Sequence, residues 1–264
     1  MLRLIRCELW KLKRKRFIPF VIVAACLFPI PLTIIAIRPT VFTGYDNFGD
    51  LFDGLFYMVL GYGIQFLLPC MLGVIASMLF FTERDNSTFK SLRVVPVTST
   101  QMVCAKIAVL FLFGILFCVA STVATVLCGL ATLTVHGIGY KLLLAVVTGI
   151  FVTAGTLPLI AAVVFFTNTT IFSVLLCVFY SVLNLNATML YNILPRGVLW
   201  MLPTPLTTFW SAGEMVAHGA VIDLSQMNAY HLIPSTWQVV LILGTMAGLS
   251  LALIIRFYKQ RGNQ

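Results

Sequence analysis

Few residues in this 264-residue sequence have the types and spacing that catalysis requires. The seven cysteines form no C-x-x-C pair, and the three histidines, at 136, 218 and 231, are dispersed. Metal and redox sites need such groups at short, fixed spacings. The sequence also has no G-x-S-x-G serine elbow, no H-E-x-x-H zinc helix and no G-x-x-x-x-G-K-[ST] phosphate loop. We therefore predict a chain without catalysis, metal or cofactor of its own, and with histidines solvated in loops.

A polar segment at residues 82–106, between two long apolar runs, has the side chains best suited to binding another protein. It includes Glu83-Arg84-Asp85-Asn86-Ser87-Thr88-Phe89-Lys90-Ser91-Leu92-Arg93-Val94-Val95-Pro96. Residues 86–87 are suitable helix caps. Phe89 and Leu92 would then lie on one side of a short helix that Pro96 ends. Such a helix suits docking into a groove of a partner, and an ordinary connecting loop is the alternative.

The amino-terminal residues 1–16 are a second candidate contact element. Four apolar residues recur at helical spacing, and Glu8 and many basic residues occupy the remaining positions. The apolar residues are Leu2, Ile5, Leu9 and Leu12. We expect a helix that lies in the membrane interface with its basic residues near anionic headgroups. A solvated basic cluster that only fixes orientation is the alternative.

The elements that position these segments are predicted from composition. Hydrophobic residues make up 60% of the chain and charged residues 9%, which excludes a soluble or disordered protein. Six uncharged apolar runs are long enough to cross a bilayer. They are residues 17–37, 55–81, 107–135, 142–166, 171–190 and 237–255. We predict an all-α integral membrane protein, one domain over 1–264, with the first run kept as a span rather than cleaved as a signal.

Within these six runs the polar side chains are neutral. No Asp, Glu, Lys, Arg or His lies inside them, whereas ion-coupled carriers place such a group near the midplane. Energy for any transport would therefore enter from outside the spans. Gln65, Asn184 and Asn186 are the candidate residues for lining a translocation path. Prolines at 29, 31, 69 and 158 are expected to kink their helices.

The net charge of +9 follows from the orientation of the spans. With both termini in the cytoplasm, 14 of the 17 basic residues lie on the inner side, and the outer segments have a net charge of −2. The basic excess thus needs no nucleic acid as a partner. One segment complicates this topology, because residues 197–213, inside the long outer loop 191–236, are uncharged but interrupted by Pro203 and Pro205. We expect a broken, re-entrant element or an interfacial loop there.

The segment at 82–106 resembles the coupling segment of permease subunits of type-2 ABC exporters, which runs roughly E-x-E-x-G-T-x-K-x-L-L-x-x-P with a later lysine. The matching residues are Glu83, Asp85 in place of the second acid, Thr88, Lys90, Leu92, Pro96 and, as the later lysine, Lys106. Arg84 and Phe89 lie within the same segment. Ser87 replaces the glycine and Arg93 the second leucine. The opening Glu8-Leu9-Trp10-Lys11-Leu12-Lys13-Arg14 is similar to that of the lantibiotic-immunity and bacitracin-resistance permeases.

The resemblance implies a bacterial plasma-membrane transporter of two permease chains and two cytosolic ABC ATPase subunits. ATP and Mg²⁺ would bind the partner ATPase, and residues 83–96 with the interface helix would transmit its motion to the spans. The second permease would be another copy or a sibling chain. The implied substrate is a membrane-active peptide such as a lantibiotic, for immunity or resistance. A lipid or a small hydrophobic drug is the alternative substrate, and a non-transporting immunity or sensor protein that sequesters a peptide is the alternative class.

Overall fold

The computed structural model describes residues 2–14, 17–38, 47–85, 98–166, 170–220 and 229–262. The first half contains α1 (Leu2–Arg14), α2 (Phe17–Ala25), α3 (Pro29–Ala36), α5 (Phe48–Met58), the π-helix η1 (Val59–Ile64), α6 (Gln65–Asp85) and α8 (Ser99–Thr132). The second half contains α9 (Ile138–Phe166), α10 (Thr170–Met189), α11 (Arg196–Met201), α12 (Pro203–Ala217), the 3₁₀ helix η2 (Ala229–Leu232) and α13 (Thr236–Gly262). The described residues include no strand.

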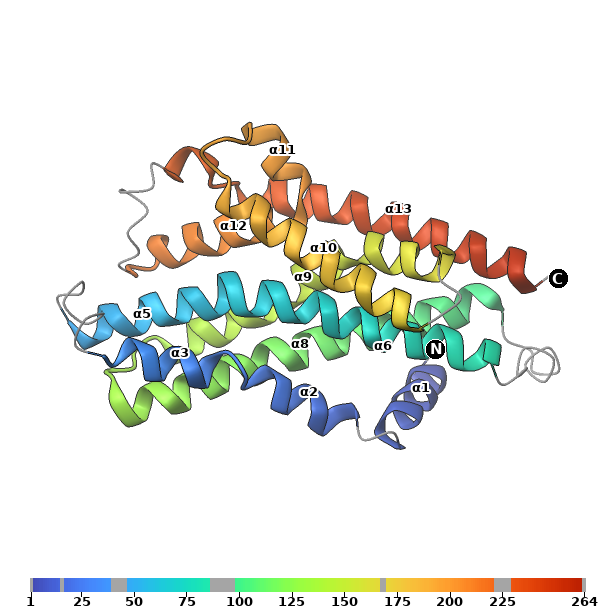
Figure 1. Cartoon of the computed structure of the whole chain (residues 1–264), viewed down its shortest axis with the longest axis horizontal. Helices are drawn as coiled ribbons and strands as arrows, with labels where there is room; N and C mark the ends of the chain where they lie inside the picture. The colour runs from blue at the N-terminus through green and yellow to red at the C-terminus, as the bar shows by residue number, and fades with distance from the viewer. Residues whose placement is uncertain are drawn as a thin grey trace.

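Within the described ranges, six helical segments are long and apolar enough to cross a membrane, which confirms the predicted all-α integral membrane fold. They are Phe17–Ala36, Phe48–Phe81, Ser99–Thr132, Ile138–Phe165, Ile171–Met189 and Thr236–Tyr258. Figure 1 shows them running along one axis, with both chain termini toward the same end of the bundle. We call that end the terminal end, and the end where α5 and α9 begin the opposite end.

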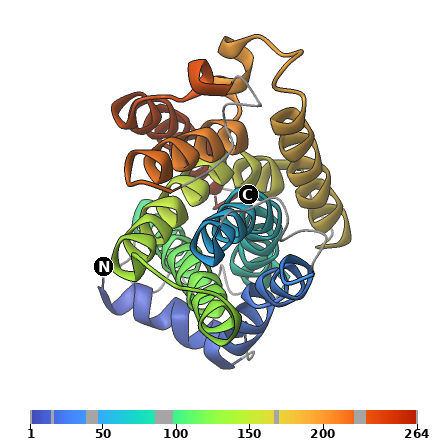
Figure 2. The ribbon, with the colours of Figure 1, turned by 90° about the vertical axis from the view of Figure 1, so that its left-hand side faces the viewer.

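The continuous segment α5–η1–α6 lies in the middle of the bundle. In the end-on view of Figure 2, α3, α8, α9 and α10 lie around it. It and α9 are the most buried spans, whereas the first, fifth and sixth spans expose most of their apolar side chains. A helix that is apolar on all sides must contact either a protein core or lipid. The outer spans therefore present the surface that lipid or another membrane chain covers.

The helix α1 lies across the long axis of the bundle, as Figures 1 and 2 together show. Leu12 is buried, and Ile5 and Leu9 pack against the same core cluster, whereas Leu2 is 84% exposed. Glu8 is buried and accepts a 2.7 Å hydrogen bond from Lys11. Three of the four apolar residues of the predicted stripe thus face the bundle.

The predicted prolines fall at two kinds of position. Pro29 is the first residue of α3, where its missing N–H would have no helical partner in any case, and a turn at residues 26–28 separates α3 from α2. Pro31 follows in the same first turn. Pro69 and Pro158 lie inside α6 and α9, which continue past them. The π-helix η1 ends one turn before Pro69, so the middle span departs from α-helical geometry near its centre.

The prediction that the spans contain no ionisable residue is wrong. The helices begin earlier than the uncharged runs: α5 at Phe48, α8 at Ser99 and α9 at Ile138. Asp53, Lys106 and Lys141 therefore lie inside candidate spans, and all three are buried. A count of uncharged residues stops at the first charge, whereas a helix continues through a charge that has a partner.

Candidate functional site

The segment predicted as a broken outer element is a pair of short helices that enters the bundle and leaves it. α11 ends at Met201, Leu202 adopts an extended conformation (φ −94°, ψ 126°), and Pro203 begins α12. A Cβ added to Gly155, near the middle of α9, would lie only 2.4 Å from the Cβ of Pro203. The start of α12 is therefore deep in the bundle, and Figure 1 shows the helix running back toward the opposite end. The broken element thus packs inside the bundle, with most of the α12 side chains buried.

Hydrogen bonds connect α12 to the middle span at this depth. The Gln65 amide nitrogen donates to the Thr207 hydroxyl over 2.7 Å, and that hydroxyl donates to the Pro203 carbonyl of its own helix over 2.8 Å. Thr208 donates to the carbonyl of Gly61, in η1, over 3.4 Å. Hydroxyls that bond backbone carbonyls satisfy polar groups that water cannot reach in a bilayer. Thr207 and Thr208 thus tie α12 to the start of α6 and to η1.

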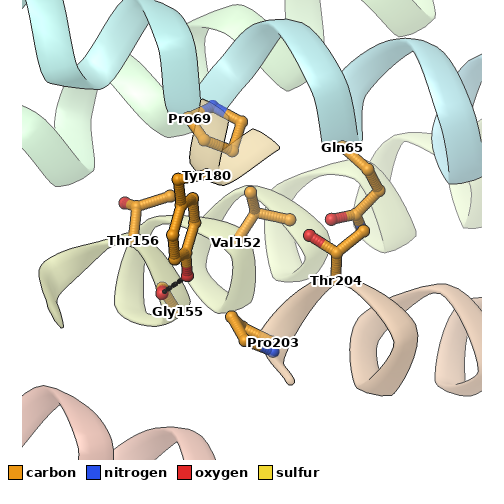
Figure 3. A pocket seen from close by; sticks show the side chains of 8 residues that line it. All are labelled: Gln65, Pro69, Val152, Gly155, Thr156, Tyr180, Pro203 and Thr204. Atoms are coloured by element: carbon orange, nitrogen blue, oxygen red, sulfur yellow. Dashed lines mark hydrogen bonds between the residues drawn. The ribbon is translucent and has the colours of Figure 1, made fainter. Parts of the chain in front are cut away.

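A small pocket lies between α6, α9, α10 and α12, where these irregularities meet (Figure 3). Its lining residues are Gln65, Pro69, Val152, Gly155, Thr156, Tyr180, Pro203 and Thr204. The Tyr180 hydroxyl donates to the Gly155 carbonyl over 2.8 Å. That carbonyl precedes Pro158 by three residues, in the turn that the proline ring disrupts. The pocket is too narrow to hold a water molecule.

The three side chains predicted to line a path have different positions. Gln65 lines the pocket, and its amide oxygen is buried without a hydrogen-bond partner among the described residues. Asn184 is buried one turn beyond Tyr180, donates to the Tyr180 carbonyl over 3.0 Å, and has a similarly unpartnered oxygen. Asn186 is exposed and donates to Val182 of its own helix. The structure thus brings Gln65 to the pocket and directs Asn186 away from the core.

Sequence reasoning did not identify Gly155, Tyr180 and Thr207. A glycine three residues before Pro158 is a signal for close helix packing next to a weakened turn, and it could have been recognised. Tyr180 and Thr207 carry no such local signal, because their partners are distant in sequence.

A second polar cluster, buried at the opposite end, consists of Asp53 of α5, Lys141 of α9 and His136 before α9. The Lys141 ammonium donates to one carboxylate oxygen of Asp53 over 2.6 Å and to the His136 carbonyl over 2.9 Å. The other carboxylate oxygen lies 3.1 Å from the His136 ring nitrogen Nε2. Lys141 also lies 4.4 Å from the Phe52 ring centroid. Both charges are almost fully buried and each is bonded, as burial of a charge requires.

The first turn of α9 also contacts α12. The Tyr140 ring stacks on His218 with a centroid distance of 3.8 Å and an interplanar angle of 19°. His218 is the C-terminal cap of α12, and its ring nitrogen Nδ1 lies 2.9 Å from the Glu214 carbonyl. His136 and His218 are exposed outside the helices, as expected, but each also has a defined partner, Asp53 and Tyr140 respectively.

At the terminal end, Lys106 is fully buried in α8. It donates to the Leu79 carbonyl of α6 and lies 5.1 Å from the Phe80 ring centroid. The α8 helix starts at a capping box formed by Thr98 and Gln101. Lys106 therefore connects the two helices that flank the predicted coupling segment.

The coupling segment itself is described only at its edge. The backbone of Glu83, Arg84 and Asp85 forms the last turn of α6. The other predicted coupling residues, Thr88, Phe89, Lys90, Leu92 and Pro96, lie outside the described residues.

Comparison with protein families matches residues 4–184 to the family described as ABC-2 family transporter protein. The matched region runs from α1 into α10, and the re-entrant pair α11–α12 and α13 lie beyond it. No individually curated protein matches the sequence. The match covers more than half of the chain and agrees with the six apolar spans. The chain therefore belongs to the ABC-2 transporter family and is a multi-pass transmembrane permease subunit.

Proposed function

We propose that this permease forms an ATP-driven exporter with two cytosolic ABC ATPase subunits and a second permease chain, another copy or a sibling. The terminal end faces the cytoplasm of a bacterial cell, so both termini are cytoplasmic. ATP and Mg²⁺ bind the ATPase subunits. The observation that carries the proposal is the uncharged pocket between four helices, two of which contain an internal proline, in a chain of the ABC-2 family. Such a pocket has no ionisable group to couple to an ion gradient.

The coupling role is assigned to α1 and residues 83–96. Lys106 supports it, because its bond to Leu79 connects α6 with α8, the two helices that this segment joins in the sequence. Helices that move as packed, bistable units can transmit a displacement at one end to the pocket in the middle.

Copurification tests the class of protein. The chain, gently solubilised from its native cells, should copurify with an ABC ATPase.

Substitutions test the coupling role of residues 83–96. Glu83→Ala or Phe89→Asp should reduce ATP-dependent transport without preventing insertion of the chain into the membrane. Lys13→Met, on the exposed side of α1, is the control for a general charge effect. Full transport in both loop variants would show that this segment does not couple.

The proposed substrate is a membrane-active antimicrobial peptide such as a lantibiotic. A pocket of amide, hydroxyl and apolar groups suits an amphipathic molecule, and the predicted net charge of −2 on the outer segments favours a cationic one. A lipid or a small hydrophobic drug would suit the same lining and is the alternative substrate.

Protection of cells against added nisin, with the native ATPase and with a hydrolysis-dead ATPase, tests the substrate and separates the classes. Export predicts protection that is lost with the dead ATPase. Protection that persists would indicate sequestration, and its absence in both strains would exclude this peptide as substrate.

A further inference from the structure

The cluster of Asp53, His136 and Lys141 lies on the same two helical segments as the pocket. Asp53 precedes Gln65 by 12 residues in the middle span, and Lys141 precedes Val152 by 11 residues in α9. In α9, at 1.5 Å per residue, this separation corresponds to about 16.5 Å. Both helices run from the opposite end toward the terminal end (Figure 1). The ion pair therefore joins the two helices at one level, and the pocket lies between them at a deeper level.

The position of the cluster allows the charges of Asp53 and Lys141 to separate. The ion pair is almost fully buried, but the His136 side chain beside it is 55% exposed. Water that replaces His136 can hydrate the separated charges, whereas charges separated in the middle of the bilayer would have no such solvent. A charged contact that breaks during a transport cycle is therefore better placed here than beside Gln65.

We propose that Asp53, His136 and Lys141 form a latch that holds the pocket closed toward the opposite end of the bundle. Separation of α5 from the first turn of α9 breaks the latch and opens a path to Gln65 and Thr204. The assignment of this end to the cell exterior rests on the orientation given under the proposed function. The latch itself depends only on the contacts between α5, α9 and the residue before it.

The accessibility of the pocket to a membrane-impermeant thiol reagent tests the latch without substrate or ATP. Thr204 lines the pocket and is 3% exposed, so Thr204→Cys reports on its opening. The probe is trimethylammonioethyl methanethiosulfonate added to sealed vesicles, with the unmodified Thr204 chain as the background for the native cysteines. With the latch intact the cysteine should react slowly. Lys141→Met should raise its rate at least tenfold, and Lys141→Arg, which keeps the charge, should raise it much less.

A second buried cysteine separates a latch from a general loss of packing. Ser77 is fully buried in α6, toward the terminal end. In the Lys141→Met background, Ser77→Cys should remain unreactive. Equal acceleration at positions 77 and 204 would overturn the latch in favour of general stabilisation, and no acceleration at 204 in a correctly inserted chain would also overturn it.

A replacement variant and a comparison of vesicle orientations complete the test. If Lys141→Met does not insert, His136→Ala replaces it, because it removes one contact to Asp53 and keeps the ion pair. A smaller acceleration at 204 is then expected, and an unchanged rate overturns the proposal. Right-side-out and inside-out vesicles are compared, since reaction only in inside-out vesicles would contradict the proposed orientation while still supporting the latch.

Discussion

The pocket in the middle of the bundle and the latch at its opposite end are both buried and polar, but they differ in charge. The pocket is lined by amide, hydroxyl and backbone groups, and the latch by a carboxylate, an ammonium and an imidazole. The difference follows the depth of each region in the bundle. Neutral groups can be satisfied by helix backbones anywhere in a membrane, whereas paired charges are tolerated best where water is close. Four substitutions test this contrast.

Lys141→Met should have the largest effect on stability. It leaves the Asp53 carboxylate buried without its cation, and removal of one partner from a buried ion pair lowers the free energy of unfolding by about 3–5 kcal/mol. The apparent melting temperature of the solubilised chain, followed by size-exclusion chromatography after heating, measures it. The exposed Lys13→Met is the matched control, and Asp53→Leu with Lys141→Met should recover most of the loss. Equal decreases in the melting temperature of Lys141→Met and Lys13→Met would contradict a stabilising role for the buried ion pair.

Gly155→Ala should have the next largest effect, because the added methyl group would lie 2.4 Å from the Pro203 Cβ and displace the start of α12. Overpacking of this kind lowers stability by about 1–3 kcal/mol. In contrast, Gly244 of α13 has open space around it, so Gly244→Ala should leave stability unchanged or raise it by up to about 1 kcal/mol. The same melting assay compares the two variants. A stable Gly155→Ala chain would contradict the deep position of Pro203.

Tyr180→Phe removes the hydroxyl that bonds the Gly155 carbonyl over 2.8 Å. The carbonyl stays buried next to the turn weakened by Pro158, so stability should fall by about 0.5–1.5 kcal/mol. Tyr230→Phe is the control, because Tyr230 is 55% exposed. If both substitutions give the same melting temperature, the Tyr180 bond contributes nothing measurable to the pocket.

Gln65→Leu should change stability least. It removes a bond to Thr207 but also a buried amide oxygen that has no partner among the described residues, so the two effects offset within about 1 kcal/mol. Transport, measured by protection against the peptide or by efflux from vesicles, should nevertheless fall sharply if Gln65 contacts the substrate. Asn186→Leu, on the exposed side of α10, should leave transport intact. The opposite ranking of the two variants would place the path along the other face of α10.

Long-range contacts explain where the sequence predictions succeeded and where they did not. Apolar runs identified six spans, because a helix that crosses a bilayer needs about 20 apolar residues whatever it packs against. Gln65 stood out as a polar group in such a run. Its partner Thr207 is 142 residues away, so no local pattern could pair them.

The ion pair of Asp53 and Lys141 was not predicted for the same reason, because its partners are distant in the sequence. Asp53 and Lys141 were assigned to outer loops because each ends an uncharged run. They are 88 residues apart, and only the tertiary structure brings α5 and the start of α9 close enough for an ion pair. A charge without a visible partner predicts a helix end, and a charge with a partner allows the helix to continue.

The sequence by itself determined the class of protein, the six spans and the all-α fold, because transfer of apolar side chains from water to lipid depends on composition and length alone. It also indicated that prolines interrupt the segment at 197–213. Only the tertiary structure decided that this segment enters the bundle, that its start meets Gly155 and Gln65, and that Asp53 and Lys141 form a buried ion pair at the opposite end. Those features depend on distances between helices that are far apart in the chain, and such distances are fixed by packing rather than by local preference.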